Sequence, residues 1–282
     1  MTKPMTIPND ADFASSPLPF SGDCFKGQLV LVSGGGSGIG KATAWCFARL
    51  GAHVIITGRT EQKLIDTVAA LTSAGLSASY KIQDIRDYDV IAAMYADIFA
   101  EFGRLDILIN NAGGQFPQSA IDFSKNGWDA VVSNNLNGSW YMMQHAARQW
   151  RDRKQQGSIV NIVAVVPRGM NGGAHTCAAR AGVIHLSKTV AVEWAEYNIR
   201  VNCVAPGVIF SEGMRAYSPE ALSEFDKSNP MKRFGTPWDI AQACVYLGGP
   251  SGSFITGEVL TLDGGGQLWG DLWMQGRPDY FR

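Results

Sequence analysis

The eight residues from Ser33 to Gly40, Ser-Gly-Gly-Gly-Ser-Gly-Ile-Gly, are suited to binding a phosphate group. They follow a short apolar run, Gln28 to Ser33, and precede a segment with apolar residues at helical spacing. Glycines in such a turn let backbone amides and the amino end of a helix approach a pyrophosphate. The placement between a strand and a helix favours a dinucleotide-binding loop over an ordinary flexible turn. We expect contacts from Ser33, Gly34, Gly36, Ser37, Gly38, Ile39 and Gly40.

Arg59 follows the second predicted strand, at the place where an acidic residue would accept the ribose hydroxyls of NAD. Residues 57 to 59 are Thr-Gly-Arg and include no acid. A surface arginine with no partner is the simpler interpretation, but an arginine at this place suits the 2′-phosphate of NADP. We therefore predict NADPH as the cofactor and expect NAD to be disfavoured.

The elements that must position these residues alternate in type along the chain. Short runs rich in β-branched residues are separated by longer helical patterns, which is typical of βαβ units and a parallel sheet. The sequence predicts a single-domain Rossmann fold with a seven-stranded parallel sheet and helices on both faces. The predicted strands are Gln28 to Ser33, His53 to Thr57, Ala78 to Ile82, Asp106 to Asn110, Ser158 to Val163, Ile199 to Val204 and Glu258 to Leu262.

The composition favours a small molecule as the partner. The 282 residues include 24 basic and 25 acidic ones, so the net charge of -1 provides no field for nucleic acid or a membrane surface. No apolar stretch reaches the roughly 18 to 20 residues of a membrane span. The five cysteines lack the spacing of a disulfide framework or a metal site. We expect a cytoplasmic protein without a metal.

Three segments differ from this regular pattern. Residues 1–25 are rich in proline and are expected to form an irregular arm before the domain, which spans 26–266. Residues 211–237 have the composition of a mobile loop and are expected to form a lid. The tail, 267–282, contains Trp269, Trp273, Tyr280 and Phe281, more apolar surface than a solvated tail would expose. We expect it to dock on the core or on another subunit.

Further segments occur in a familiar order: Asp84-Ile85, Asn110-Asn111-Ala112-Gly113, Asn135 and Pro206-Gly207-Val208-Ile209. Together they resemble the short-chain dehydrogenase/reductase family over roughly Lys26 to Gly266. The resemblance implies that Asp84 and Ile85 meet the adenine and that Asn111, Ala112 and Gly113 line the cofactor. It also implies that Pro206 and Gly207 bind the cofactor and that the residues from Val208 to Ser211, among them Val208, Ile209 and Ser211, meet its carboxamide. Finally, it implies a homotetramer paired through the helices over Asn126 to Trp150 and Ala174 to Glu196.

The usual active-site residues of that family are replaced. Its serine would stand at the end of the fifth strand, where this chain reads Asn161-Ile162-Val163-Ala164. Its Tyr-x-x-x-Lys pair falls on Thr176 and Arg180. Arginine can donate hydrogen bonds to ribose hydroxyls, but it stays protonated and relays protons poorly. It is therefore a poor substitute for the tyrosine and lysine in alcohol oxidation, which requires proton transfer. In a conjugate reduction, hydride goes to the β-carbon and donors need only stabilise an enolate oxygen.

Two divergent relatives fit this logic, the peroxisomal trans-2-enoyl-CoA reductases and the 2,4-dienoyl-CoA reductases. The chain is similar to the former at Gly113-Gly114-Gln115-Phe116, Ala174-His175-Thr176 and Ala178-Ala179-Arg180-Ala181-Gly182. This similarity implies an acyl-CoA substrate, with Gln115 and Phe116 in contact with it. The tyrosines proposed as catalytic in the relatives fall near Val165 or at Ile184.

Four residues are the candidates for catalysis. His175 is a possible proton donor, although a lone histidine near a helix start is more often a structural hydrogen-bonder. Thr176 competes for that role, Arg180 is expected to bind both ribose and oxyanion, and Asn135 to hold a water or a neighbouring helix. Three hypotheses follow: an NADPH-dependent reductase of an enoyl or dienoyl thioester, a dehydrogenase of a hydrophobic alcohol or hydroxyacyl thioester, and a cofactor-binding protein without turnover.

Overall fold

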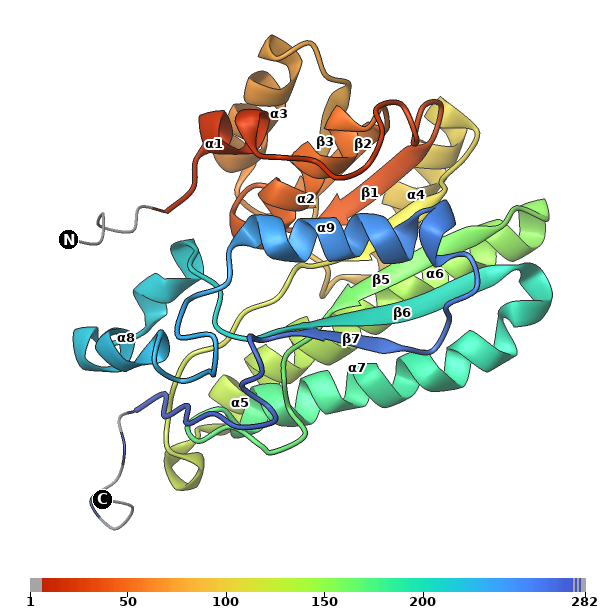
Figure 1. Cartoon of the computed structure of the whole chain (residues 1–282). Helices are drawn as coiled ribbons and strands as arrows, with labels where there is room; N and C mark the ends of the chain where they lie inside the picture. Colours follow the sequence, from red (N-terminus) through yellow and green to blue (C-terminus); the bar gives the residue numbers. More distant parts are fainter. Residues whose placement is uncertain (1–6, 276, 278, 280–282) are drawn as a thin grey trace.

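A sheet of seven parallel strands forms the centre of the molecule (Figure 1). The computed structural model describes residues 7–275, 277 and 279. The strand order is β3-β2-β1-β4-β5-β6-β7, so the chain reverses its direction of travel across the sheet between β1 and β4. The strands are β1 (Leu29–Ser33), β2 (His53–Gly58), β3 (Ala78–Ile82), β4 (Ile107–Asn110), β5 (Gly157–Ile162), β6 (Ile199–Pro206) and β7 (Val259–Leu262). The predicted Rossmann fold is confirmed.

Both faces of the sheet are covered by helices, because successive side chains of a strand point to opposite faces. In β1, Val30 and Val32 pack into one apolar core and Leu29 and Leu31 into the other. The first core includes α2 (Gly38–Arg49), α3 (Glu61–Ser73) and α9 (Pro237–Gly248). The second includes α4 (Tyr88–Phe102), α6 (Gly138–Arg153) and α7 (Ala174–Glu193). Within the described residues, no helix has the length and apolar character needed to cross a membrane.

The amino-terminal arm is not wholly irregular, and the prediction is corrected here for residues 10–15. These residues form α1 (Asp10–Ser15), which the Asn9 side chain caps by accepting backbone N–H groups. Phe13 is 2% exposed and stacks on Trp238 of α9, while Asp10 forms an ion pair of 3.1 Å with Lys41 of α2. A capped turn with one buried aromatic is therefore enough to order this part of the arm. Residues 1–6 lie outside the described residues.

The remaining short elements lie beside the carboxyl ends of the strands or in connecting loops. The expected lid, 211–237, contains a 3₁₀ turn at Glu212–Ala216 and α8 (Pro219–Phe225), which lies apart from the sheet in Figure 1. α5 (Lys125–Val132) runs into α6 through a π-helical turn, Ser133–Asn137. Further 3₁₀ turns lie at Ala120–Asp122, Ala195–Tyr197 and Pro250–Gly252.

Candidate functional site

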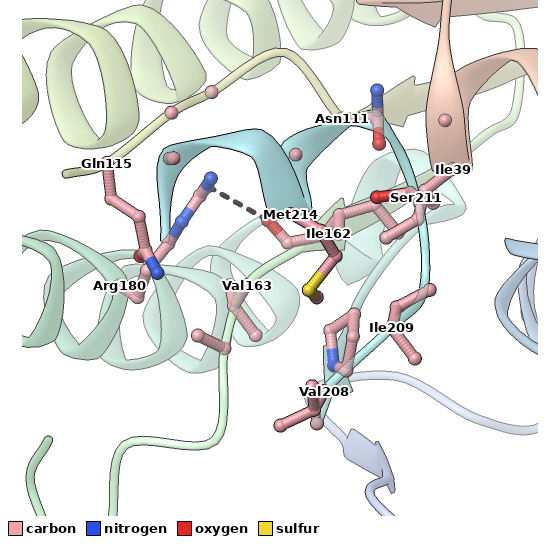
Figure 2. Close-up of a pocket in the computed structure, with 18 of the residues that line it drawn as sticks. Ile39, Asn111, Gln115, Ile162, Val163, Arg180, Val208, Ile209, Ser211 and Met214 are labelled. Atoms are coloured by element: carbon pink, nitrogen blue, oxygen red, sulfur yellow. Dashed lines mark hydrogen bonds between the residues drawn. The ribbon is translucent and has the colours of Figure 1, made fainter. Parts of the chain in front are cut away.

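A cleft of about 1070 Å³ opens at the carboxyl ends of the strands. Thr57 and Gly58 of β2, Ile162 of β5 and Pro206 of β6 all reach it. Parallel sheets of this kind bind ligands at the point where the strand order reverses, here between β1 and β4. Figure 2 shows labelled residues from both sides of this point around one pocket: Ile39 follows β1, whereas Arg180 and Ser211 follow β5 and β6.

The glycine-rich loop forms the phosphate end of the cleft. Gly34 has φ +68° and a Cβ there would lie 2.9 Å from Asn111 Nδ2. At Gly40, a Cβ would come within 2.3 Å of the Gly34 carbonyl oxygen. These positions therefore need glycine, and the loop can fold tightly over the amino end of α2. Ser37 caps that helix without a side-chain hydrogen bond, which leaves its first amides available for an anion.

The predicted loop residues take two different positions. Gly34, Gly36, Ser37, Gly38 and Ile39 line the cleft. Ser33 and Gly40 are buried behind them and do not line it. The Ser33 hydroxyl accepts the backbone N–H groups of Asn111 and Ala112, at 3.0 and 2.9 Å. Ser33 and Gly40 therefore shape the loop that a cofactor would contact.

Arg59 is exposed and lines the cleft beyond β2, as the sequence predicted. Lys63, in the first turn of α3, lines the same end, and its Cβ lies 3.0 Å from the position that a Cβ at Gly36 would take. Lys63 was missed from the sequence, although its place at the start of the helix that follows Arg59 is a usable signal. No acidic residue of β2 faces these cations. The residues present therefore fit a cofactor with a 2′-phosphate.

Asp84 and Ile85, for which the family resemblance implies contact with the adenine, both line the cleft. The Asp84 carboxylate accepts from Nε of Arg86 at 2.9 and 3.0 Å. The hydrogen bond with Arg86 lowers the pKa of Asp84, so this carboxylate stays ionised at neutral pH. Asp84 therefore pairs with Arg86 and forms no ion pair with Arg59, whose side chain can bind another anion.

Two loops, one after β4 and one after β6, form another part of the cleft. Pro206, Gly207, Val208, Ile209 and Ser211 line the cleft after β6, and Asn111, Ala112 and Gly113 line it after β4. A Cβ at Gly207 would lie 2.7 Å from Asp263 Cα, so glycine allows these two loops to approach. The predicted residues of both loops are thus brought to one cleft.

Arg180 is the only predicted catalytic residue that reaches the cleft. Its side chain extends from α7, is 8% exposed, and donates Nη1 to the carbonyl of Ile162 at 2.9 Å (Figure 2). A Cβ at Gly113 would lie 2.2 Å from Nη2, so glycine at 113 leaves room for the guanidinium. Burial lowers the pKa of Arg180 to about 10, which keeps it protonated at neutral pH. None of the ion pairs among the described residues includes Arg180.

Asn135 lies in the π-helical turn before α6 and is fully buried. Its Oδ1 accepts the N–H of Gly114 at 3.0 Å, and its Nδ2 donates to the carbonyl of Gly114 at 2.9 Å. The side chain thereby satisfies both backbone groups of one exposed loop residue. Asn135 does not itself line the cleft, so its observed role is to position the loop that carries Gly113 and Gln115.

His175 and Thr176 are fully buried and do not line the cleft, contrary to expectation. The imidazole of His175 packs against the rings of Phe116 and Phe123, with centroids 4.8 and 4.4 Å away. Its Nδ1 accepts the backbone N–H of Thr176 at 2.7 Å, and burial lowers its pKa. Phe116, expected to contact substrate, is also absent from the cleft lining. These residues form a small apolar cluster at the start of α7, where tertiary packing overrides the sequence interpretation.

The remaining part of the cleft, called the substrate half from here on, brings together segments distant in sequence. Its lining includes apolar side chains as well as charged ones such as Arg168, Arg215 and Asp271. Gln115 lies there as predicted, and its Nε2 donates to the hydroxyl of Tyr217 at 2.8 Å. Tyr217 was not predicted from the sequence, because its segment has no regular pattern. The apolar lining consists of Val163, Val165, Met170, Met214, Phe225, Leu272, Trp273 and Met274.

Part of the tail closes this half of the cleft. Arg168 donates to the carbonyl of Gly270 at 3.2 Å, and Asp271 N–H donates to the carbonyl of Ser228 at 3.2 Å. Met274 is 3% exposed, whereas Leu268 and Trp269 are more than 80% exposed. Residues 270–275 thus dock on the core, while the two large side chains before them do not. Tyr280 and Phe281 lie outside the described residues.

The part of the chain that the structure describes contains no group of three or more His, Cys, Asp or Glu side chains arranged to hold a metal ion.

Comparisons with known proteins agree with this geometry. Residues 34–267 match a family model described as enoyl-(acyl carrier protein) reductase. The chain is 41% identical to a probable 2,4-dienoyl-CoA reductase of Bacillus subtilis, over 84% of this chain and 96% of the relative. It is 37% identical to a peroxisomal 2,4-dienoyl-CoA reductase of Arabidopsis thaliana, over 89% and 87%. Among solved structures, a citronellol catabolism dehydrogenase of Pseudomonas aeruginosa superposes with TM-score 0.79 at 37% identity, covering 88% of this chain and 98% of that one.

Proposed function

Because this chain belongs to the short-chain dehydrogenase/reductase family and is therefore an NAD(P)-dependent oxidoreductase, we propose that it reduces the α,β double bond of an enoyl or dienoyl thioester with NADPH. The observation that carries this proposal is Arg180, a buried cation in the cleft at the family's lysine position. Its Nη1 donates to a neutral group, the carbonyl of Ile162.

A buried charge without a counter-ion is costly, so the cleft favours a ligand that brings negative charge to Arg180. When hydride adds to the β-carbon of an enoyl thioester, the charge develops on the thioester oxygen. A fixed cation in a site that excludes water stabilises such a charge more in the transition state than in the ground state. Arg180 therefore suits conjugate reduction, which asks the protein for charge stabilisation before proton transfer.

NADPH bound in the cleft would supply the hydride. The residues that would hold it are the loop from Gly34 to Ile39, the Asp84-Ile85 pair and the backbone of Pro206 to Ile209. Arg59 would bind its 2′-phosphate, with Lys63 adding a second positive charge nearby. Arg180 is close enough to Gly113 to share the cofactor's loop, and its remaining donors can serve the ribose hydroxyls or the thioester oxygen.

The substrate half supports an acyl thioester. Its apolar lining, from Val163 to Met274, suits an acyl chain, whose burial contributes roughly 0.8 kcal/mol per CH₂. Two of the relatives carry names that specify dienoyl-CoA. We propose that the carrier is CoA and that residues 211–237 act as the lid over this half.

A second candidate function is oxidation of a hydrophobic alcohol. The observation that favours it is the likeness to the citronellol catabolism dehydrogenase, which covers nearly the whole of both chains. Alcohol oxidation needs a general base beside the hydroxyl, and Arg180 is a poor one. The same apolar cleft would bind either substrate, so the reaction must be decided by assay.

The decisive experiment follows the absorbance of NADPH with trans-2-enoyl-CoA and 2,4-dienoyl-CoA substrates of several lengths. The reverse assay supplies NADP and hydrophobic alcohols. We expect oxidation of NADPH by a thioester and a saturated or singly reduced product by mass spectrometry. Turnover of alcohols alone would support the second candidate. Cofactor binding without turnover of any substrate would support a non-catalytic role.

The assembly is also part of the proposal. The exposed apolar side chains of Val192 on α7 and Phe254 before β7, 79% and 103% exposed, suit burial against another subunit. We propose a homotetramer in the cytoplasm.

A further inference from the structure

Tyr217 brings a phenol into the substrate half of the cleft from the segment after β6. It lies between the 3₁₀ turn at Glu212–Ala216 and α8, and lines the cleft together with Gln115. Its ring packs edge-to-face on Phe225 of α8, with centroids 5.2 Å apart. The position of the hydroxyl is thus set from two sides, by a ring contact behind it and an amide in front of it.

The direction of the hydrogen bond leaves the phenol hydrogen available. Gln115 Nε2 donates to the Tyr217 hydroxyl at 2.8 Å, so the phenol oxygen is the acceptor. Within the described part of the chain, the structure shows no acceptor for the hydroxyl's own hydrogen. A phenol has one such hydrogen and the bond from Gln115 does not use it. It can therefore be donated to a ligand in the cleft.

The environment keeps this phenol protonated until it is needed. Burial raises the pKa of Tyr217, while the hydrogen bond from Gln115 acts in the opposite direction. The amide would also stabilise the phenolate that forms when the proton leaves, because an N–H donor favours the charged oxygen. With Gln115 as hydrogen-bond donor, the Tyr217 hydroxyl can lose its proton to a ligand and later be protonated again.

We infer that Tyr217 is a catalytic residue, the general acid that protonates the α-carbon, in place of the tyrosine absent from α7. This inference rests on the proposed function. Hydride adds to the β-carbon, and the electrons of the double bond move to form an enolate whose oxygen lies by Arg180. The enolate then re-forms the carbonyl, its α-carbon takes the proton of Tyr217 as the O–H bond breaks, and the phenolate is left accepting from Gln115. Water later returns a proton to the phenolate.

The other candidates fit less well. His175 and Thr176 are fully buried outside the cleft, and Arg180 remains protonated at neutral pH. Tyr217 is the tyrosine among the described residues that lines the cleft. Tyr217 belongs to the segment after β6, whereas the family's tyrosine position, Thr176, is on α7 after β5.

The test is Tyr217→Phe, which keeps the ring against Phe225 and removes only the hydroxyl. With an enoyl-CoA that the unchanged protein reduces, we expect kcat to fall by roughly 10²- to 10⁴-fold. The Kd for NADPH, measured by fluorescence, should stay the same. In D₂O, the unchanged protein should place deuterium on one face of the α-carbon, whereas the variant, protonated by water, should give both configurations. Tyr246→Phe on α9, outside the cleft, is the matched control and should change neither readout.

Gln115→Leu is the second variant, and it loses the amide that supports the phenolate. It should lower kcat less than Tyr217→Phe and shift the pH profile of kcat, a change that a packing defect would not cause. If the unchanged protein reduces the thioester and Tyr217→Phe retains its rate and its single product configuration, Tyr217 is not the acid. If no thioester is reduced by the unchanged protein, the proposed function fails and this role fails with it.

Discussion

Arg180 on α7 donates a hydrogen bond of 2.9 Å to the carbonyl of Ile162 at the end of β5. This bond holds a permanent positive charge at the carboxyl end of β5, beside the cleft. Gly113 has no side chain and so leaves room for the guanidinium. The lysine that other family members use at this place is a single point charge, whereas the guanidinium has donors left over after binding Ile162.

Arg180→Ala should lower both the affinity for NADPH and the turnover, because it removes the charge and its donors. Arg180→Lys keeps the charge and should recover part of the cofactor affinity. The measurements are Kd by fluorescence and kcat with an enoyl-CoA. Unchanged cofactor affinity in a folded Arg180→Ala protein would mean that the active site is misplaced.

Arg59 should set the preference for NADPH. A charge-assisted contact with the 2′-phosphate predicts binding of NADPH roughly ten- to a hundredfold tighter than NADH. Arg59→Ala should erase most of that difference without affecting NADH, as measured by titration of each cofactor. Arg151→Ala, an arginine on α6 outside the cleft, is the matched control. Equal Kd values for both cofactors in the unchanged protein would refute the role of Arg59.

His175 should matter for stability and not for turnover. His175→Phe replaces one ring by another between Phe116 and Phe123, so kcat should stay within about twofold, against the roughly 10²- to 10⁴-fold loss expected for a general acid. Thermal melting checks that the variant folds. A large loss of turnover with normal melting would restore the catalytic interpretation.

The same substitution should alter the acid sensitivity of the fold. Burial lowers the pKa of His175 in the folded state, so the unfolded state binds more protons as the pH falls below the ordinary histidine pKa of about 6.5. The stabilisation is present above that value and is lost below it. Urea unfolding at several pH values should therefore show a smaller acid loss for His175→Phe than for the unchanged protein. Identical pH slopes would contradict this account. His53 and His145, whose pKa values burial also lowers, should contribute to the acid loss in both proteins.

The proposed tetramer should depend on Phe254 and Val192. Replacing Phe254 by Lys places a charge where we expect apolar contact between subunits, and should give a smaller species by light scattering at micromolar concentration. Replacing the equally exposed Ile121 by Lys is the control, since it lies in a different loop. A monomer in the unchanged protein would rule out the tetramer.

Much of the fold and the cofactor end of the site was decided by local sequence. The β-branched runs predicted all seven strands, and the glycines from Gly34 to Gly40 predicted the phosphate loop, because steric limits on backbone conformation act within a few residues. Arg59 follows from its place after β2. Such features need only neighbours in the chain, so they can be predicted without a structure.

The catalytic half was decided by tertiary structure. Arg180 and His175 stand on the same helix, five residues apart, and the sequence made both candidates. Only the tertiary packing of α7, which lies against β6 and α5, brings Arg180 to the carbonyl of Ile162 in the cleft and buries His175 beside Phe116 and Phe123. The bond between Gln115 and Tyr217 joins residues 102 positions apart. No local pattern encodes such a contact, because it exists only once the segment after β6 has folded over the loop after β4.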